Sequence, residues 1–154
     1  MGATLEEPRL LERDAELDGI RAAVERAVAG EGGLVVVEGP AGIGKSRLLA
    51  ASRRAAGAHG MAALAARGGE LERDFAYGVV RQLLERPLLD APEDERRALL
   101  SGAARLAEPA LGLGLGLAAD DPAPAGPGGD VSFAAAHGLY WLVSNLAVRE
   151  PLLL

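Results

Sequence analysis

One short segment of the chain combines glycines, a lysine and a serine at a spacing that suits phosphate binding. Residues 39–46 fit the pattern G-x-x-x-x-G-K-[ST] without a mismatch, and this pattern is typical of a P-loop. The glycines allow consecutive backbone N–H groups to turn toward one anion, and a helix that begins directly after them directs its positive end at the same anion. The predicted phosphate site consists of Gly39, Pro40, Ala41, Gly42, Ile43, Gly44, Lys45, Ser46 and Arg47.

Two side chains of this segment have distinct predicted roles. Lys45 is the only lysine of the chain, beside fifteen arginines, and it offers a compact point charge where arginine would offer a broad planar fork. This scarcity of lysine weighs against the alternative, an accidental glycine-rich turn in a chain that has 21 glycines. We expect Lys45 to reach the β- and γ-phosphates of a nucleotide and the Ser46 hydroxyl to ligate Mg²⁺.

Hydrolysis of a nucleotide would require an acid at the end of a strand that neighbours the P-loop. Asp120 and Asp121 follow an apolar stretch, but the glycines and prolines around them favour a linker over a strand. Asp90 follows residues 87–89, which we interpret as turn-like. The expected place for the acid is beyond Leu154, so no catalytic residue is assigned and enzymatic activity is left open, with weak ATP hydrolysis as one alternative.

The elements that position the P-loop follow from the hydrophobic pattern. Apolar residues recur at helical spacing over residues 10–29, at Leu17, Ile20, Val24 and Val28. The β-branched run at residues 34–37 predicts a buried strand that leads into the P-loop. A helix over residues 45–58 and a second strand over residues 61–66 are expected to follow.

The second half of the chain predicts helices, a linker and the beginning of a strand. Helices are expected over residues 75–84 and 93–106, the latter opened by the acids Glu93, Asp94 and Glu95. Residues 109–130 are rich in glycine and proline and predict a mobile linker. A further helix covers residues 131–147, and residues 152–154 resemble the opening of a strand. The expected packing residues of that last helix are Phe133, His137, Tyr140, Trp141 and Leu146.

Composition restricts the protein class further. The 154 residues carry a net charge of −6, which disfavours binding of nucleic acid or anionic lipid through bulk charge. The absence of cysteine excludes disulfides and thiolate metal sites. Neither a signal peptide nor a membrane span is expected, so we predict a cytoplasmic location. His59 and His137 have no partners at metal-ligand spacing and are interpreted as surface or packing residues.

Three segments together resemble the N-terminal part of the AAA-type ATPase module of large ATP-binding LuxR-family transcriptional regulators, which belong to the STAND group of P-loop switches. These segments are residues 10–17, the P-loop, and residues 66–84, which follow the second predicted strand. The resemblance implies that the opening segment, with Arg13, lies near an adenine and that the nucleotide is ATP. Residues 150–154 resemble the start of the strand that carries the Walker B aspartates in that family.

The resemblance predicts an α/β fold, a three-layer P-loop NTPase domain with a parallel sheet, which ends before the Walker B acid. We divide residues 1–154 into an N-terminal helical segment (1–33), a P-loop strand–helix core (34–108), a linker (109–130) and a last helix with the start of the Walker B strand (131–154). The predicted function is a nucleotide switch within a regulator, here as a fragment without its DNA-binding domain. Its partners would be ATP and either a second copy or the remainder of the regulator.

Two alternatives stay open at this point. A free-standing P-loop ATPase or small-molecule phosphotransferase would need a catalytic acid within the chain. A gene remnant that does not fold would leave strand edges unpaired and apolar surface exposed.

Overall fold

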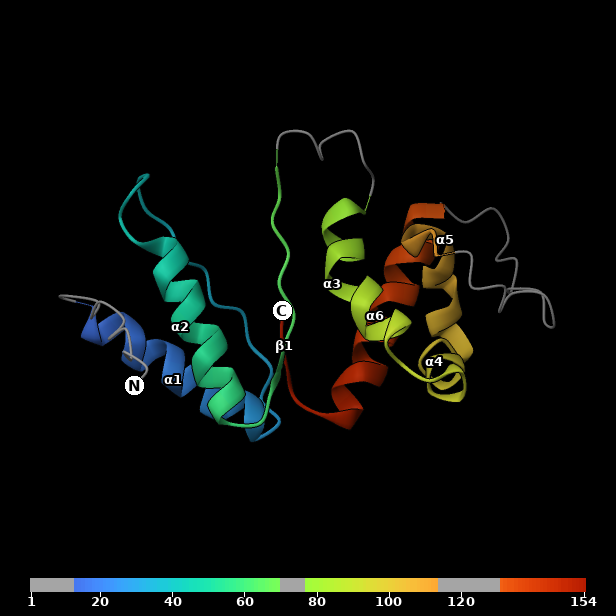
Figure 1. The fold of residues 1–154 in the computed structure, drawn as a ribbon, viewed down its shortest axis with the longest axis horizontal. Helices are drawn as coiled ribbons and strands as arrows, with labels where there is room; N and C mark the ends of the chain where they lie inside the picture. The colour runs from blue at the N-terminus through green and yellow to red at the C-terminus, as the bar shows by residue number, and fades with distance from the viewer. Residues whose placement is uncertain (1–12, 70–76, 114–130) are drawn as a thin grey trace, which may run out of the picture. The chain divides into compact units, whose positions relative to one another are not determined.

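The computed structural model describes residues 13–69, 77–113 and 131–154, and the chain divides into two compact units. The first unit takes the residues up to Ala63 together with Leu153, and the second takes Leu64–Leu152 together with Leu154. Figure 1 shows the helices and strands of both units in chain order. The P-loop belongs to the first unit.

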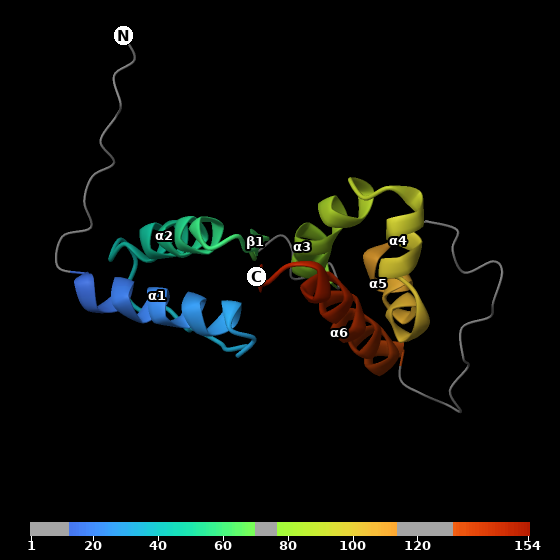
Figure 2. The ribbon, with the colours of Figure 1, turned by 90° about the horizontal axis from the view of Figure 1, so that it is seen from below.

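The first unit contains two helices that pack side by side, α1 (Asp14–Val28) and α2 (Lys45–Ala58) (Figures 1 and 2). The apolar stripe of α1 buries Ile20 and Val24 as predicted, whereas Val28 is exposed at the end of the helix. Val24 packs in a small cluster with Ala56 and Met61. Both helices are confirmed, and α2 has the predicted bounds.

Two strands of two residues each form the sheet found in the described residues. β1 (Ala62–Ala63) pairs with β2 (Leu152–Leu153). The strand predicted over residues 61–66 is therefore shorter than expected, while the strand predicted from Leu152 is confirmed.

The strand predicted over residues 34–37 is wrong. These residues have no regular secondary structure, and Leu34, Val35 and Val36 are 89%, 55% and 68% exposed. A strand requires a neighbour to accept and donate its backbone hydrogen bonds, and the two described strands pair with each other. The β-branched composition of the run indicated strand propensity but could not supply that neighbour.

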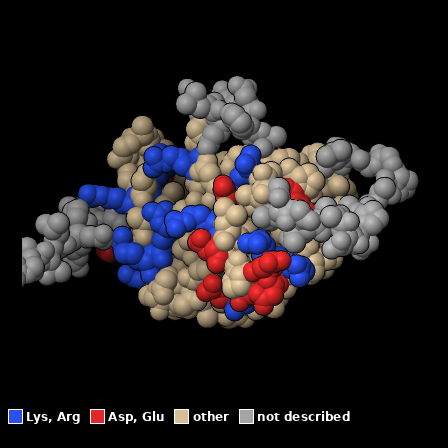
Figure 3. Space-filling view, turned by 45° about the vertical axis from the view of Figure 1, so that its right-hand side comes forward, with Lys and Arg blue, Asp and Glu red and all other residues tan. Residues whose placement is uncertain are grey.

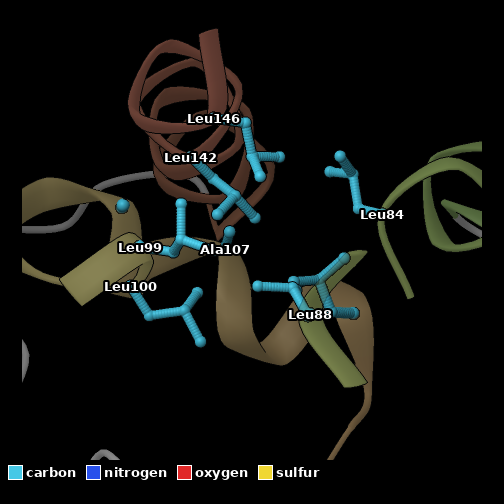
Figure 4. Packing of buried hydrophobic residues seen from close by; sticks show 9 residues of the cluster. Leu84, Leu88, Leu99, Leu100, Ala107, Leu142 and Leu146 are labelled. Carbon is cyan, nitrogen blue, oxygen red and sulfur yellow. The ribbon is translucent and has the colours of Figure 1, made fainter. Parts of the chain in front are cut away.

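The second unit is helical. Its elements are α3 (Gly78–Leu89), α4 (Glu93–Leu99), the 3₁₀ helix η2 (Gly102–Ala107), α5 (Glu108–Leu111) and α6 (Val131–Arg149). Figure 4 shows how leucines from α3, α4 and α6 converge on η2. The fully buried members of this core include Leu84, Leu88, Leu111 and Leu142.

Several predicted boundaries in this unit need correction. The helix predicted over 75–84 continues to Leu89 through Pro87, because Leu84 and Leu88 lie one turn apart and both enter the core. Residues 87–89 are thus helical and not turn-like, and residues 75 and 76 lie outside the described residues. The helix predicted over 93–106 ends at Leu99, and Gly102 takes a left-handed conformation (φ 60°) at the start of η2.

The predicted linker is also shorter than expected at its beginning. Residues 109–111 belong to α5, where Pro109 stands in the first turn, a position that lacks an intrahelical N–H partner in any case. The part of the predicted linker from residue 114 to residue 130 lies outside the described residues.

The helix predicted over 131–147 is confirmed as α6, but its packing face differs from the prediction. Leu142 and Leu146 are buried, whereas Phe133, Tyr140 and Trp141 are exposed. The reason is a close crossing at Gly138, where an added Cβ would lie 2.2 Å from the backbone nitrogen of Ala107 in η2. This contact turns the small and aliphatic side of α6 toward the core and the aromatic side away from it.

Candidate functional site

The P-loop segment adopts the backbone conformation that its glycines allow. Gly42 and Gly44 have left-handed φ angles of 80° and 97°, which L side chains rarely adopt. At Gly39 an added Cβ would lie 3.0 Å from Cγ2 of Ile43, so a side chain there would also press on the loop. Local geometry therefore favours glycine at the two glycine positions of the pattern, Gly39 and Gly44, and also at Gly42 between them.

Helix α2 begins directly after the loop, with Gly44 as its N-cap residue. The Gly44 carbonyl accepts hydrogen bonds from the N–H groups of Arg47 (3.0 Å) and Leu48 (3.2 Å). The first turn of α2 has no acidic residue, so the positive end of the helix is not neutralised by its own side chains. Ser46 lies in this turn and is exposed.

The Lys45 side chain folds back over the loop. Its Nζ donates hydrogen bonds to the carbonyl oxygens of Gly39 (2.7 Å) and Pro40 (2.9 Å). The ammonium group thus lies against the segment that the sequence pattern assigns to phosphate, with two carbonyl oxygens at hydrogen-bond distance.

Arg13 connects the beginning of α1 to the same loop. Its Nη2 donates a hydrogen bond to the carbonyl oxygen of Ile43 (3.3 Å), and its Nη1 bonds to the carboxylate of Glu16. This hydrogen bond from the Arg13 side chain is the main cause that lowers the pKa of Glu16 below its ordinary value of 4.5. The structure therefore places the Arg13 side chain in contact with the backbone of the P-loop. Its expected position near an adenine stays a prediction.

Glu16 was not singled out from the sequence, although a signal was present. It lies three residues after Arg13 on a helix, a spacing at which side chains of opposite charge meet. Asp18 and Arg21 (2.6 Å) form a second α1 pair of the same spacing, with the acid before the base. Spacing alone could not tell which pair adjoins the loop.

Two other polar residues considered from the sequence have partners in the helices that they cap. Asp90 is the C-cap residue of α3 in the second unit, with its carboxylate 4.0 Å from Nε of Arg86. His59 is the C-cap residue of α2 and bonds through Nδ1 to the Ala55 carbonyl oxygen (2.8 Å). Asp120 and Asp121 lie outside the described residues.

The residues present suit a cation held mainly by oxygen atoms of a ligand. No group of three or more His, Cys, Asp or Glu side chains is placed to hold a metal ion within the described ranges. On the face drawn in Figure 3, acidic and basic side chains lie next to one another and do not form a surface of a single sign. A divalent ion bound together with phosphate could take the exposed Ser46 hydroxyl as a protein ligand, with the remaining ligands supplied by phosphate and water.

The phosphate-binding element of a P-loop protein consists of a glycine-rich loop, a lysine at its end and a helix that begins directly after the loop. The sequence model of one protein family, described as AAA ATPase domain, matches residues 9–153. The chain therefore belongs to the AAA ATPase domain family, which implies a P-loop NTPase fold and a nucleotide-binding module. Searches among curated proteins and among solved structures found no significant match.

None of the described helices is long and apolar enough to cross a lipid bilayer.

Proposed function

We propose that this chain binds ATP together with Mg²⁺ at the loop formed by residues 39–47, and that Arg13 contributes to the same site. The observation that carries this proposal is the position of the Lys45 ammonium, which two backbone carbonyls hold directly over the glycine-rich loop. A cation in this place, next to the N-terminus of α2, attracts the charge of a polyphosphate from two sides.

The chain's own residues would act in separate ways. The backbone N–H groups of the loop and of the first turn of α2 would bind phosphate oxygens, and Lys45 would leave its carbonyl partners to neutralise the outer phosphates. The Ser46 hydroxyl would be the protein ligand of Mg²⁺. When bound, the metal ion would supply charge neutralisation between neighbouring phosphates.

We further propose that nucleotide binding serves as a switch within a LuxR-type transcriptional regulator of the STAND group, whose AAA ATPase domain has a three-layer fold with a parallel sheet. Family membership and the similarity of residues 66–84 to such regulators support this proposal. A switch of this kind requires that ATP bind one conformational state better than the other. Partners would then be ATP and other parts or copies of the regulator, while this segment itself would make no direct contact with nucleic acid.

Calorimetric titration with ATP and Mg²⁺ tests the binding proposal. We expect the unmodified chain to bind and Lys45→Ala to lose most of its affinity, because the substitution removes the only lysine and the point charge over the loop. Arg53→Ala is a matched control, since it removes one cation from the exposed middle of the same helix. Equal affinity for Lys45→Ala and the unmodified chain would contradict the assignment.

Turnover separates the switch from a free-standing enzyme. Steady release of phosphate by the purified chain would favour an ATPase or phosphotransferase with a catalytic acid of its own. Binding without such turnover is the result expected for the switch.

A further inference from the structure

Arg13 uses both ends of its guanidinium group, and each end has a different partner. One terminal nitrogen bonds to the Glu16 carboxylate on α1, and the other donates to the Ile43 carbonyl oxygen at 3.3 Å. The guanidinium group is planar and its donors have fixed directions. The bond to Glu16 therefore limits the orientations in which the Arg13 guanidinium group can contact the loop.

The Ile43 carbonyl belongs to the peptide group that carries the N–H of Gly44. The described chain has no cis peptide bonds, and in a planar trans peptide the C=O and the N–H point in opposite directions. When Arg13 fixes this carbonyl on the α1 side, it also directs the Gly44 N–H away from α1. Gly44, which follows this peptide, has no Cβ and a left-handed φ of 97°, so its side of the peptide plane meets less steric restriction than another residue would impose.

We propose that Glu16 is a positioning residue of the nucleotide site, which acts through Arg13 to hold the Ile43–Gly44 peptide with its N–H toward the bound phosphates. This inference rests on the proposed function. It assigns the Arg13–Glu16 pair to the phosphate end of the ligand, with no contact to the base. The loss of Glu16 then weakens binding of any polyphosphate, whichever base it carries.

The sign of the effect distinguishes positioning from simple charge. Glu16→Gln removes a negative charge near an anion site, which by Coulomb attraction alone would strengthen the binding of phosphate. Positioning predicts the opposite, an affinity about threefold to tenfold weaker, because the loop amide loses its fixed direction. Asp18→Asn is the matched control, since it removes one carboxylate from an ion pair of the same spacing on the same helix.

The experiment compares the affinities of three probes, Mg·ATP, Mg·GTP and Mg·tripolyphosphate, for the unmodified chain, Glu16→Gln and Asp18→Asn. We expect Glu16→Gln to lose the same factor for all three probes and Asp18→Asn to lose none. In an Arg13→Ala background, Glu16→Gln should cause no further loss of affinity, because the contact through which Glu16 acts on the loop is gone. A loss confined to ATP would overturn the inference, since it would place the pair at the adenine. Unchanged or tighter binding by Glu16→Gln would also overturn it.

A readout without nucleotide keeps this inference separate from the proposed function. In the free protein, Glu16→Gln should shift the amide resonance of Gly44 in ¹H–¹⁵N spectra, whereas Asp18→Asn should leave it in place. If the unmodified chain binds no nucleotide, the proposed function fails whatever this resonance does. If the chain binds and Lys45→Ala abolishes binding, an unmoved Gly44 resonance in Glu16→Gln refutes the positioning role alone.

Discussion

The pKa of Glu16 reports on its ion pair with Arg13 at the start of α1. Its pKa is lowered chiefly by the side-chain hydrogen bond from Arg13, so the carboxylate should titrate below the ordinary value of 4.5. In Arg13→Ala the titration midpoint should rise toward that value. NMR titration of the side-chain carboxyl carbon measures both midpoints, and identical midpoints in the two proteins would contradict the ion pair.

The direction of this shift fixes its effect on stability. A carboxyl group with a lowered pKa in the folded state contributes stability at pH values above its unfolded-state pKa, and the contribution disappears as the pH falls through the folded-state pKa. Both side chains are partly exposed, so solvent screens the pair and its contribution to stability is small. We therefore expect the Arg13–Glu16 pair to orient the P-loop and to contribute little to the free energy of folding.

Much of the candidate site could be predicted from residue identities. The glycine spacing and the single lysine determined where the loop begins and where α2 starts, because left-handed turns and helix N-termini have local causes. The role of Glu16 could not be predicted, since it depends on Arg13 reaching Ile43, thirty residues away in the chain. Contacts of this range require the packing of α1 against α2.

At the scale of single elements, the crossing of α6 over η2 depends on the absence of one side chain. We expect Gly138→Ala to destabilise the protein, because its Cβ would lie 2.2 Å from the Ala107 backbone nitrogen. Overpacking of this kind costs about 1–3 kcal/mol. The gain in helix propensity, about 1 kcal/mol, does not offset it when backbone must move. Urea unfolding at equilibrium measures the difference.

Gly19→Ala is the control for this substitution. Gly19 lies inside α1, and a Cβ at this position would meet nothing within 4 Å. The same chemical change should therefore stabilise the protein by about 0.5–1 kcal/mol. Destabilisation by both substitutions to the same extent would show that the crossing at η2 is not the cause.

Helices of this chain were easier to predict than strands for a physical reason. The bounds of α2 follow from local signals, a glycine N-cap and a segment composed mostly of helix-forming residues. The run at residues 34–37 has strand propensity of the same clarity, but strand formation depends on partners elsewhere in the chain. The aromatic residues of α6 were wrongly predicted to pack in the core for a related reason. The close crossing at Gly138 determines which face of the helix is buried, and that contact lies elsewhere in the chain.

At the scale of the whole molecule, the two compact units differ in how much core each one has. The second unit buries a large leucine cluster, whereas the buried cluster of the first unit is Val24, Ala56 and Met61. Ion pairs and polar contacts add to the second unit, including the Asn145 Nδ2 hydrogen bond to the Leu99 carbonyl at the end of α4 (2.8 Å). Among the described residues, the proposed nucleotide site therefore lies in the unit with the smaller buried cluster.

Leu142→Ala tests the importance of the larger core. This side chain is fully buried among residues of α3, α4 and η2, so the cavity should cost about 2–5 kcal/mol. Val148→Ala, on the exposed side of the same helix, should change stability by less than about 0.5 kcal/mol. Hydrogen exchange of the α6 amides measures both effects at the affected element. Equal protection in the two variants would contradict the assigned core.

The two carbonyl partners of Lys45 also affect what a substitution there measures. Phosphate binding would exchange one set of oxygen ligands around the ammonium for another, so the lysine would begin and end the reaction solvated by oxygen. The affinity lost in Lys45→Ala is then the difference between lysine–phosphate and lysine–carbonyl interactions, and it underestimates the former. The heat of binding is reduced for the same reason, because the Lys45 side chain must break its hydrogen bonds to the loop carbonyls before it binds phosphate.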